Sequence, residues 1–103
     1  MAGFRKVATV GDIPESKMRA FQVGHSRIVL CNVAGSFYAI ADECTHDGAP
    51  ISTGRLFKEQ VVCPRHGARF NVKDGSVEAP PAIVPVETYE VRIDGDDILV
   101  AVD

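Results

Sequence analysis

The apolar residues of the chain follow mostly the pattern of β-strands. Residues 7–10 and 89–93 alternate with a two-residue period, and residues 25–33, 37–40 and 98–102 are rich in apolar, aromatic and β-branched residues. Turn-forming residues at 34–36 and 94–97 connect two pairs of these stretches, which predicts two β-hairpins. No window of a dozen residues shows a helical stripe, although residues 15–21 fit either a helical turn or a bent strand. The pattern therefore predicts an all-β protein.

The middle of the chain, approximately residues 41–81, is rich in glycine and proline and is expected to consist of loops separated by short strands. A segment of this kind has too small a core of its own and needs another source of order, such as a bound metal centre. Many short strands joined by polar turns favour an antiparallel sandwich or barrel. We therefore expect residues 1–103 to form a single domain, with a small loop-rich subdomain at about 41–81.

The composition is that of an ordinary globular protein, since 46% of the 103 residues are hydrophobic and 24% are charged. The eleven Lys and Arg residues are scattered and outnumbered by fourteen Asp and Glu, so no nucleic-acid surface is predicted. No apolar run is long enough to span a bilayer, and the first residues lead into no signal-peptide core. We therefore expect a soluble cytoplasmic protein, whose three cysteines indicate metal binding or redox chemistry rather than disulfides.

Two pairs of cysteine and histidine stand out in the middle region. One residue separates the first pair, two residues separate the second, and sixteen residues lie between the pairs, which are Cys44 with His46 and Cys63 with His66. Each pair lies where a strand is expected to meet a loop, so two neighbouring loops can present two thiolates and two imidazoles to one site. Four protein ligands are then available for a metal centre.

A structural zinc ion could use the same four ligands, because two cysteines and two histidines are a common zinc set. In zinc fingers, however, both cysteines usually form one pair and both histidines the other, whereas each pair here contains one of each. A mixed pair suits a dinuclear centre, since each loop can send its Cys to one iron and its His to the other. Gly48, Gly67 and Pro64 also suit tight loops whose backbone amides can point at sulfide and thiolate. These features favour an iron–sulfur centre and leave zinc as the alternative.

The two loops resemble those of a known family. The pentapeptides that begin at Cys44 and Cys63, CTHDG and CPRHG, are similar to the two cluster loops of Rieske proteins. The resemblance implies a Rieske-type antiparallel β-sandwich or barrel with a cluster-binding subdomain. It also implies one [2Fe-2S] cluster, in which Cys44 and Cys63 bind one iron while His46 and His66 bind the other.

The same resemblance bears on the reduction potential. A cluster with only two thiolate ligands is neutral when oxidised, so it accepts an electron more readily than a four-cysteine cluster. Respiratory Rieske proteins carry an extra Cys in each loop, forming a disulfide, and also hydroxyl residues that donate hydrogen bonds to cluster sulfur. This chain lacks the extra Cys and has Ala68 and Phe70 in place of the hydroxyl residues. We therefore expect a potential near the low end of the Rieske range, around −150 mV.

The residues also indicate what the protein does not do by itself. Only three histidines are present, so with two in the cluster the chain cannot supply the two-histidine, one-carboxylate iron site of an oxygenase. It has no Gly-rich dinucleotide fingerprint either. We therefore expect an electron carrier that is not itself an enzyme.

A more specific role follows from the family resemblance. Rieske-type ferredoxins of multicomponent aromatic ring-hydroxylating dioxygenases have this size and loop pattern. The resemblance implies electron receipt from an NAD(P)H-dependent flavoprotein reductase and delivery to a terminal oxygenase. The alternatives are a ferredoxin for another oxygenase such as a monooxygenase, the small subunit of an assimilatory nitrite reductase, and a structural zinc module.

Further expectations concern residues near the loops. Residues of small or mixed character are expected to form a docking rim for transient partners, namely Asp47, Ala49, Pro50, Pro64 and Arg65. Cys31 lies in an apolar segment and is expected to be a buried core residue. His25 is expected to be exposed or to cap the segment, and Pro80 with Pro81 to form a rigid loop.

Overall fold

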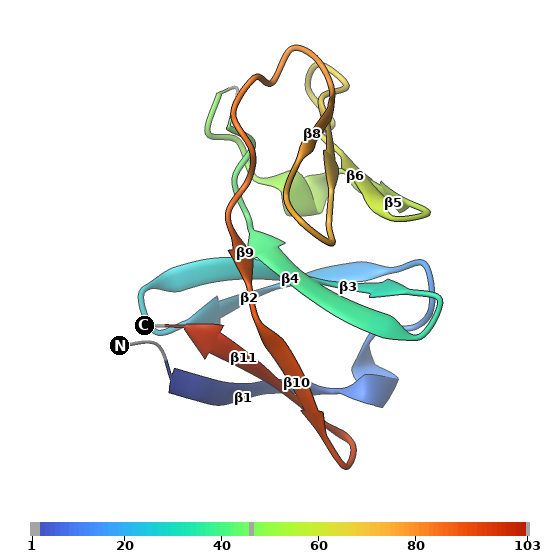
Figure 1. The fold of residues 1–103 in the computed structure, drawn as a ribbon, viewed down its shortest axis with the longest axis vertical. Helices are drawn as coiled ribbons and strands as arrows, with labels where there is room; N and C mark the ends of the chain where they lie inside the picture. Colours follow the sequence, from blue (N-terminus) through green and yellow to red (C-terminus); the bar gives the residue numbers. More distant parts are fainter. Residues whose placement is uncertain (1–2, 46, 103) are drawn as a thin grey trace.

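The computed structural model describes residues 3–45 and 47–102, which form three small antiparallel sheets (Figure 1). The first sheet has the spatial order β1 (Gly3–Thr9), β11 (Asp97–Val102), β10 (Val91–Asp94). The second has the order β2 (Met18–Val23), β3 (Ser26–Val33), β4 (Ser36–Ala41), β9 (Thr88–Tyr89). The third has the order β5 (Arg55–Phe57), β6 (Gln60–Val62), β7 (Arg69–Asn71), β8 (Val77–Ala79). The prediction of an all-β protein is confirmed.

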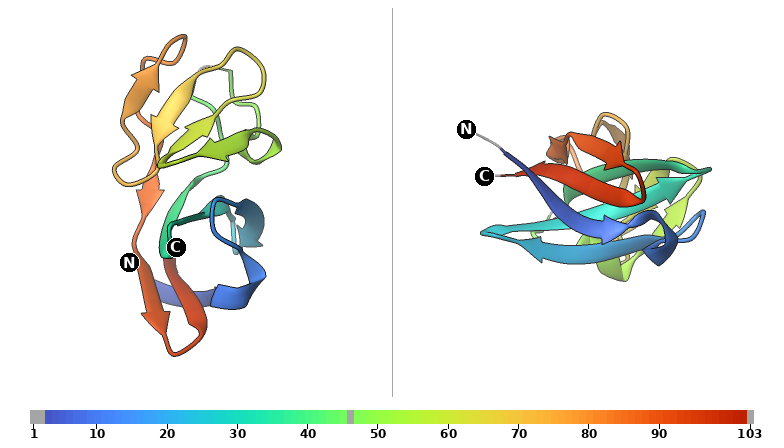
Figure 2. Two further views of the ribbon diagram at one scale, coloured as in Figure 1. Left: turned by 90° about the vertical axis from the view of Figure 1, so that its right-hand side faces the viewer. Right: turned by 90° about the horizontal axis from the view of Figure 1, so that it is seen from below.

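Two single-turn 3-10 helices complete the secondary structure of the described residues, η1 (Val10–Asp12) and η2 (Ile51–Thr53). Within that part of the chain, no helix has the length and apolar character needed to cross a membrane. The molecule is elongated, with extents of 38 × 29 × 19 Å, and the third sheet lies at one end of the long axis (Figures 1 and 2). The loops that follow β4, β6 and β8 gather at that end, which we call the loop end.

The second sheet lies between the other two and is buried on both faces along β3 (Figure 1). Ile28 and Leu30 belong to a core cluster shared with the first sheet. Val29 and Cys31 point the other way, into a cluster shared with the third sheet and the loop end. Because successive strand residues point to opposite faces, a strand between two cores has no polar face. This explains the unbroken apolar run at residues 28–31.

Both predicted hairpins are present. The strands β3 and β4 pair from Val33 opposite Ser36, and β10 and β11 pair from Asp94 opposite Asp97. The ambiguous segment 15–21 resolves into a turn followed by β2, which starts at Met18. Its strand conformation is set by pairing with β3 rather than by its own residue pattern.

The middle region consists of loops, the short helix η2 and strands of three residues each, in keeping with its glycine and proline content. Residues beyond the expected limit at 81 also pack with it, since Ala82 and Val86 are buried in the same core cluster as Cys44 and Cys63. The Pro80–Pro81 peptide bond is cis.

A buried carboxylate connects the second sheet to the start of the loop end. The Asp42 side chain is fully buried and accepts hydrogen bonds from Arg27 Nε at 2.8 Å, from the Ser52 backbone N–H at 2.7 Å and from Ser52 Oγ at 2.8 Å. Arg27 belongs to β3, and Ser52 belongs to η2. Because Asp42 precedes Cys44 by two residues, these bonds fix the point at which the chain enters the first cysteine loop.

Candidate metal centre

The first cysteine loop, residues 44–49, is closed by two backbone hydrogen bonds. The Cys44 N–H donates to the Ala49 carbonyl at 2.8 Å, and the Gly48 N–H donates to the Cys44 carbonyl at 2.7 Å. Gly48 has a φ of +78°, a left-handed conformation that suits glycine. The reversal at Gly48 brings the chain back beside Cys44, so Thr45 and Asp47 lie on the projecting part of the loop.

The second cysteine loop, residues 63–68, repeats this backbone frame. The Cys63 N–H donates to the Ala68 carbonyl at 2.7 Å, and the Gly67 N–H donates to the Cys63 carbonyl at 3.2 Å. Gly67 has a φ of +77°. The shared frame corresponds to a repeated pattern of Cys, three variable residues, Gly and Ala, which the sequence shows twice. The Cys-to-His spacing alone does not include the glycine and alanine of this repeat.

The two loops bring the cysteine sulfurs together. Cys44 is fully buried and Cys63 is 2% exposed. Their Sγ atoms and a carboxylate oxygen of Asp47 all lie within 4.8 Å of one another. Two thiolates this close can bind one tetrahedral metal ion.

The predicted histidines occupy different places in the common frame. His66 is the third residue after its cysteine and is exposed, so it lies on the outer part of the second loop. His46, the second residue after Cys44, lies outside the described residues. The structure therefore places three of the four predicted ligands on the paired loops, two of them buried and one exposed.

An ion pair connects the two loops. Arg65 Nε of the second loop lies 3.0 Å from Asp47 Oδ2 of the first, and Asp47 Oδ1 accepts the Ala49 backbone N–H at 3.0 Å. The Arg65 side chain is 62% exposed and that of Asp47 is 21% exposed. Sequence reasoning had assigned both residues to a docking rim and had not predicted this contact. The available signal was that each opposite charge stands next to a histidine, one in each loop.

A third loop, after β8, lies beside the first cysteine loop. Thr45 Oγ1 donates a hydrogen bond to the Val84 carbonyl at 2.6 Å. Ala82 and Val86 point into the core, whereas Ile83 is 87% exposed and Val84 is 54% exposed. Ile83 has the highest exposure among the large hydrophobic residues in the described ranges. Sequence reasoning missed this exposed apolar pair, because an apolar dipeptide between prolines looks no different from one that is buried.

The surroundings of the cysteines are apolar. Ala68 and Phe70 are fully buried in the cluster that contains both loop cysteines, and neither side chain carries a hydroxyl group. Cys31 is buried there as well, which confirms its predicted core position, and burial raises the pKa of its thiol to about 12. His25 is exposed, in agreement with the prediction.

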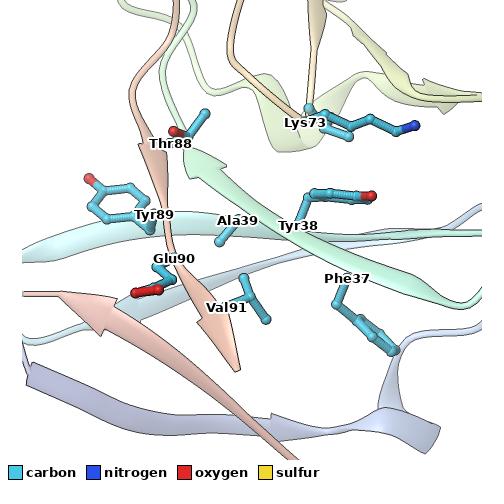
Figure 3. Close-up of a pocket in the computed structure, with 9 residues that line it drawn as sticks. Phe37, Tyr38, Ala39, Lys73, Thr88, Tyr89, Glu90 and Val91 are labelled. Atoms are coloured by element: carbon cyan, nitrogen blue, oxygen red, sulfur yellow. The ribbon is translucent and has the colours of Figure 1, made fainter. Parts of the chain in front are cut away.

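A cavity of about 390 Å³ lies away from the loops, where β4 faces β9 and β10 (Figure 3). Its lining residues come from two sheets and the β7–β8 turn; they are Phe37, Tyr38, Ala39, Val72, Lys73, Thr88, Tyr89, Glu90 and Val91. Lys73 Nζ is 3.0 Å from Glu59 Oε2. None of the lining residues is Cys or His, so this cavity is separate from the metal-binding loops.

The donor set fits a [2Fe-2S] cluster with mixed ligands. Buried, adjacent thiols suit one iron, and an exposed imidazole on the same pair of loops suits a second iron nearer the surface. The positive-φ glycines let the loop backbones turn sharply around such a centre.

Comparison with known proteins gives a consistent result. A model of the Rieske [2Fe-2S] domain matches residues 3–90. The ferredoxin component of biphenyl 2,3-dioxygenase from Rhodococcus jostii is 40% identical over 95 residues, covering 92% of this chain and 89% of that protein. The ferredoxin subunit of 3-phenylpropionate/cinnamic acid dioxygenase from Escherichia coli is 41% identical over 93 residues, covering 88% and 86%.

Solved structures show the same fold. The ferredoxin of carbazole 1,9a-dioxygenase from Nocardioides aromaticivorans has a TM-score of 0.91 and 34% identity, covering 95% of this chain and 96% of that one. A chain in the complex of reduced oxygenase and oxidized ferredoxin of carbazole 1,9a-dioxygenase has a TM-score of 0.90 and 33% identity, covering 95% and 92%.

Proposed function

Because this chain belongs to the Rieske [2Fe-2S] domain family, we propose that it is the one-electron carrier of an aromatic ring-hydroxylating dioxygenase system. It receives electrons from an NAD(P)H-dependent flavoprotein reductase and delivers them to a terminal oxygenase, and it is not itself an enzyme. The observation that carries the proposal is the pair of loops of identical frame, which brings the sulfurs of Cys44 and Cys63 together. The ferredoxin components described above match the chain over most of its length.

The proposed ligands are Cys44 and Cys63 for one iron, and His46 and His66 for the other. When bound, the cluster supplies a centre that takes up and releases one electron without making or breaking a bond to substrate. The burial of both cysteines keeps water from the thiolates. The exposure of His66 leaves the histidine side open to a partner, so we propose that electrons enter and leave there.

The apolar surroundings bear on the potential. No hydroxyl group is present at Ala68 or Phe70 to donate a hydrogen bond toward the site, and both residues are fully buried. The negative charge added on reduction is therefore less stabilised than in a site with such donors. We expect a midpoint near −150 mV, and a value above about +100 mV would contradict this reasoning.

The docking surface is proposed to be the loop end. The rim expected from the sequence consists of Asp47, Ala49, Pro50, Pro64 and Arg65, to which we add Ile83 and Val84. The addition rests on the bond from Thr45 to the Val84 carbonyl, since Thr45 precedes the proposed ligand His46. A partner that approaches the histidine side must then cover Ile83 as well.

A matched pair of variants tests this surface. Ile83→Ser is expected to raise the ferredoxin concentration needed for half-maximal oxygenase turnover by about tenfold. This corresponds to about 1.4 kcal/mol, the size of loss expected when one of the few energetically dominant residues of an interface is truncated. Ile93 on β10 is 45% exposed, and its strand lies in the first sheet, away from the loop end (Figure 1). Ile93→Ser should leave the half-maximal concentration unchanged. Equal effects of the two variants would argue against this docking surface.

The first experiment is electron paramagnetic resonance on anaerobically purified protein before and after dithionite, with iron and zinc measured in the same sample. Two irons per chain and a reduced-state signal with average g below 2 support the proposed cluster. One zinc and no signal would identify a structural zinc module instead. Reconstitution with a flavoprotein reductase and a dioxygenase then tests the partners. The alternative, the small subunit of an assimilatory nitrite reductase, would support no ring hydroxylation.

The terminal oxygenase is the better supported of the two partners. A ferredoxin similar to this chain has been solved in a complex with its oxygenase. The reductase is inferred from the need for a one-electron donor. We also propose a cytoplasmic location, where reduced cysteines are maintained, and cell fractionation tests it.

A further inference from the structure

The ion pair between Arg65 and Asp47 has two features that an ordinary surface pair lacks. It joins the two cysteine loops, which no disulfide connects in the described part of the chain. In addition, a carboxylate oxygen of Asp47 lies within 4.8 Å of the Sγ atoms of both Cys44 and Cys63. A negative charge this close to the ligand sulfurs disfavours any further negative charge on the metal centre.

We propose that the Asp47–Arg65 pair is a non-covalent cross-link between the cluster loops, and that Arg65 cancels the carboxylate charge beside the ligand sulfurs. This inference rests on the proposed [2Fe-2S] function. Reduction adds one negative charge to the cluster, so an Asp47 carboxylate without its guanidinium partner would oppose it. With Arg65 in place, the carboxylate can order the first loop through the Ala49 N–H without depressing the potential.

The two roles differ in expected size. Exposed ion pairs contribute little to stability, so loss of the cross-link should speed cluster release by only about two- to fivefold. The effect on potential should be easier to detect, because the Asp47 side chain is only 21% exposed and lies beside the sulfurs. Nearby charge is one of the main determinants of iron–sulfur potentials.

Single and double substitutions separate the two roles. Arg65→Gln leaves the carboxylate unbalanced and should lower the midpoint potential, whereas Asp47→Asn leaves the guanidinium unbalanced and should raise it. The double variant Asp47→Asn with Arg65→Gln keeps the local charge at zero, so its potential should return to the wild-type value. It should nevertheless release its cluster faster, since the ion pair is gone. Arg65→Lys keeps the charge and should keep the potential.

A second ion pair supplies the control. Lys6 Nζ and Asp97 Oδ1 lie 3.3 Å apart on β1 and β11, in the first sheet, and both side chains are exposed. Lys6→Gln changes the net charge of the protein by the same amount as Arg65→Gln but at the opposite end of the molecule (Figure 1). Salt screens such a distant charge, so the potential of Lys6→Gln should equal that of the wild type.

The experiment is protein-film voltammetry of each holoprotein, together with the rate of loss of visible absorbance in the presence of an iron chelator. Opposite potential shifts in the two single variants, reversed in the double variant, support the proposal. Shifts no larger than that of Lys6→Gln, or unchanged cluster release in the double variant, overturn it.

If a single variant fails to keep its cluster, the salt dependence of cluster release decides. Raising NaCl from about 0.05 to 1 M should speed release from the wild type but not from Arg65→Lys with Asp47→Asn. A wild-type protein without iron would instead refute the proposed function.

Discussion

The buried carboxylate of Asp42 should be one of the most sensitive positions in the molecule. It accepts three hydrogen bonds, one from Arg27 on β3 and two from Ser52 on η2. Asp42→Ala removes the acceptor for all three at once. The Arg27 side chain is 53% exposed and can turn to water, but the Ser52 N–H and hydroxyl are partly buried and would lose their acceptor.

The cost can be worked out from these contacts. A buried donor left without an acceptor costs about 1–3 kcal/mol, and hydrogen bonds to a charged group are worth about 1.5–3 kcal/mol. With two Ser52 donors affected and Arg27 compensated by water, we expect Asp42→Ala to lower the free energy of unfolding by about 3 kcal/mol. The matched control is Ser52→Ala, which removes the hydroxyl donor but keeps the backbone N–H bond. It should cost about 1 kcal/mol.

The assay is urea unfolding of the holoprotein under anaerobic conditions, followed by far-UV circular dichroism, with visible absorbance as the measure of bound cluster. For an m-value of about 1.5 kcal/mol/M, the midpoint of Asp42→Ala should fall by about 2 M and that of Ser52→Ala by less than about 1 M. Cluster release should also be faster in Asp42→Ala, since Asp42 fixes the entry to the first cysteine loop. A midpoint for Asp42→Ala no lower than that of Ser52→Ala would refute the reasoning.

Three other predictions are independent of this one. Gly75→Ala should destabilise the fold by about 2–5 kcal/mol, because the φ of Gly75 is +77° and an added Cβ would meet the Val86 carbonyl. In the same unfolding assay, the control Gly95→Ala should cost about 1–2 kcal/mol, since Gly95 has a φ of +63° but open space around it. Burial raises the pKa of the Cys31 thiol to about 12. At pH 8.5 this thiol should therefore be alkylated at least about a thousandfold more slowly in the native than in the unfolded protein, as measured by peptide mass spectrometry. Its burial stabilises the fold fully below the unfolded pKa of about 8.5, and that contribution is lost as pH rises toward 12. The Ser76 backbone N–H holds the pKa of Asp74 below 3.8. The stability that the ionised Asp74 carboxylate contributes is therefore complete above about pH 4 and is lost as pH falls through the lowered pKa. Because the bond comes from the backbone, carboxyl NMR titration should give a midpoint below 3.8 in both the wild type and Ser76→Ala.

The strands were predictable wherever a run of apolar and β-branched residues ended in turn-forming residues. The β3–β4 and β10–β11 hairpins are examples, because their turns and registers follow from local residues. The segment 15–21 was not predictable, since its strand depends on pairing with β3 across a turn. The position of β3 between two cores was also hidden, because an apolar run alone does not tell how many sheets cover it.

At the candidate site, residue types were predictable and their mutual contacts were not. The spacing of Cys to His was enough to select Cys44 and Cys63, whose sulfurs the structure brings together. The Asp47–Arg65 pair and the Thr45–Val84 bond join segments far apart in sequence. The opposite charges beside the two histidines hint at the ion pair, but no local pattern indicates the bond from Thr45 to the Val84 carbonyl. The same holds for Asp42, which looks like any other acidic residue until its burial is known.

The repeated loop frame has a consequence for engineering the metal centre. Its closing bonds run between backbone groups of the cysteines, glycines and alanines, so no side chain at 45–47 or 64–66 takes part in them, although the Asp47 carboxylate adds a bond to the Ala49 N–H. Those six positions are in effect two three-residue cassettes, inserted into one invariant loop design. Ligand type, surface charge and contact with neighbouring loops can therefore be rewritten within the cassettes. A second metal chemistry could be introduced at this end of the molecule without designing a new fold.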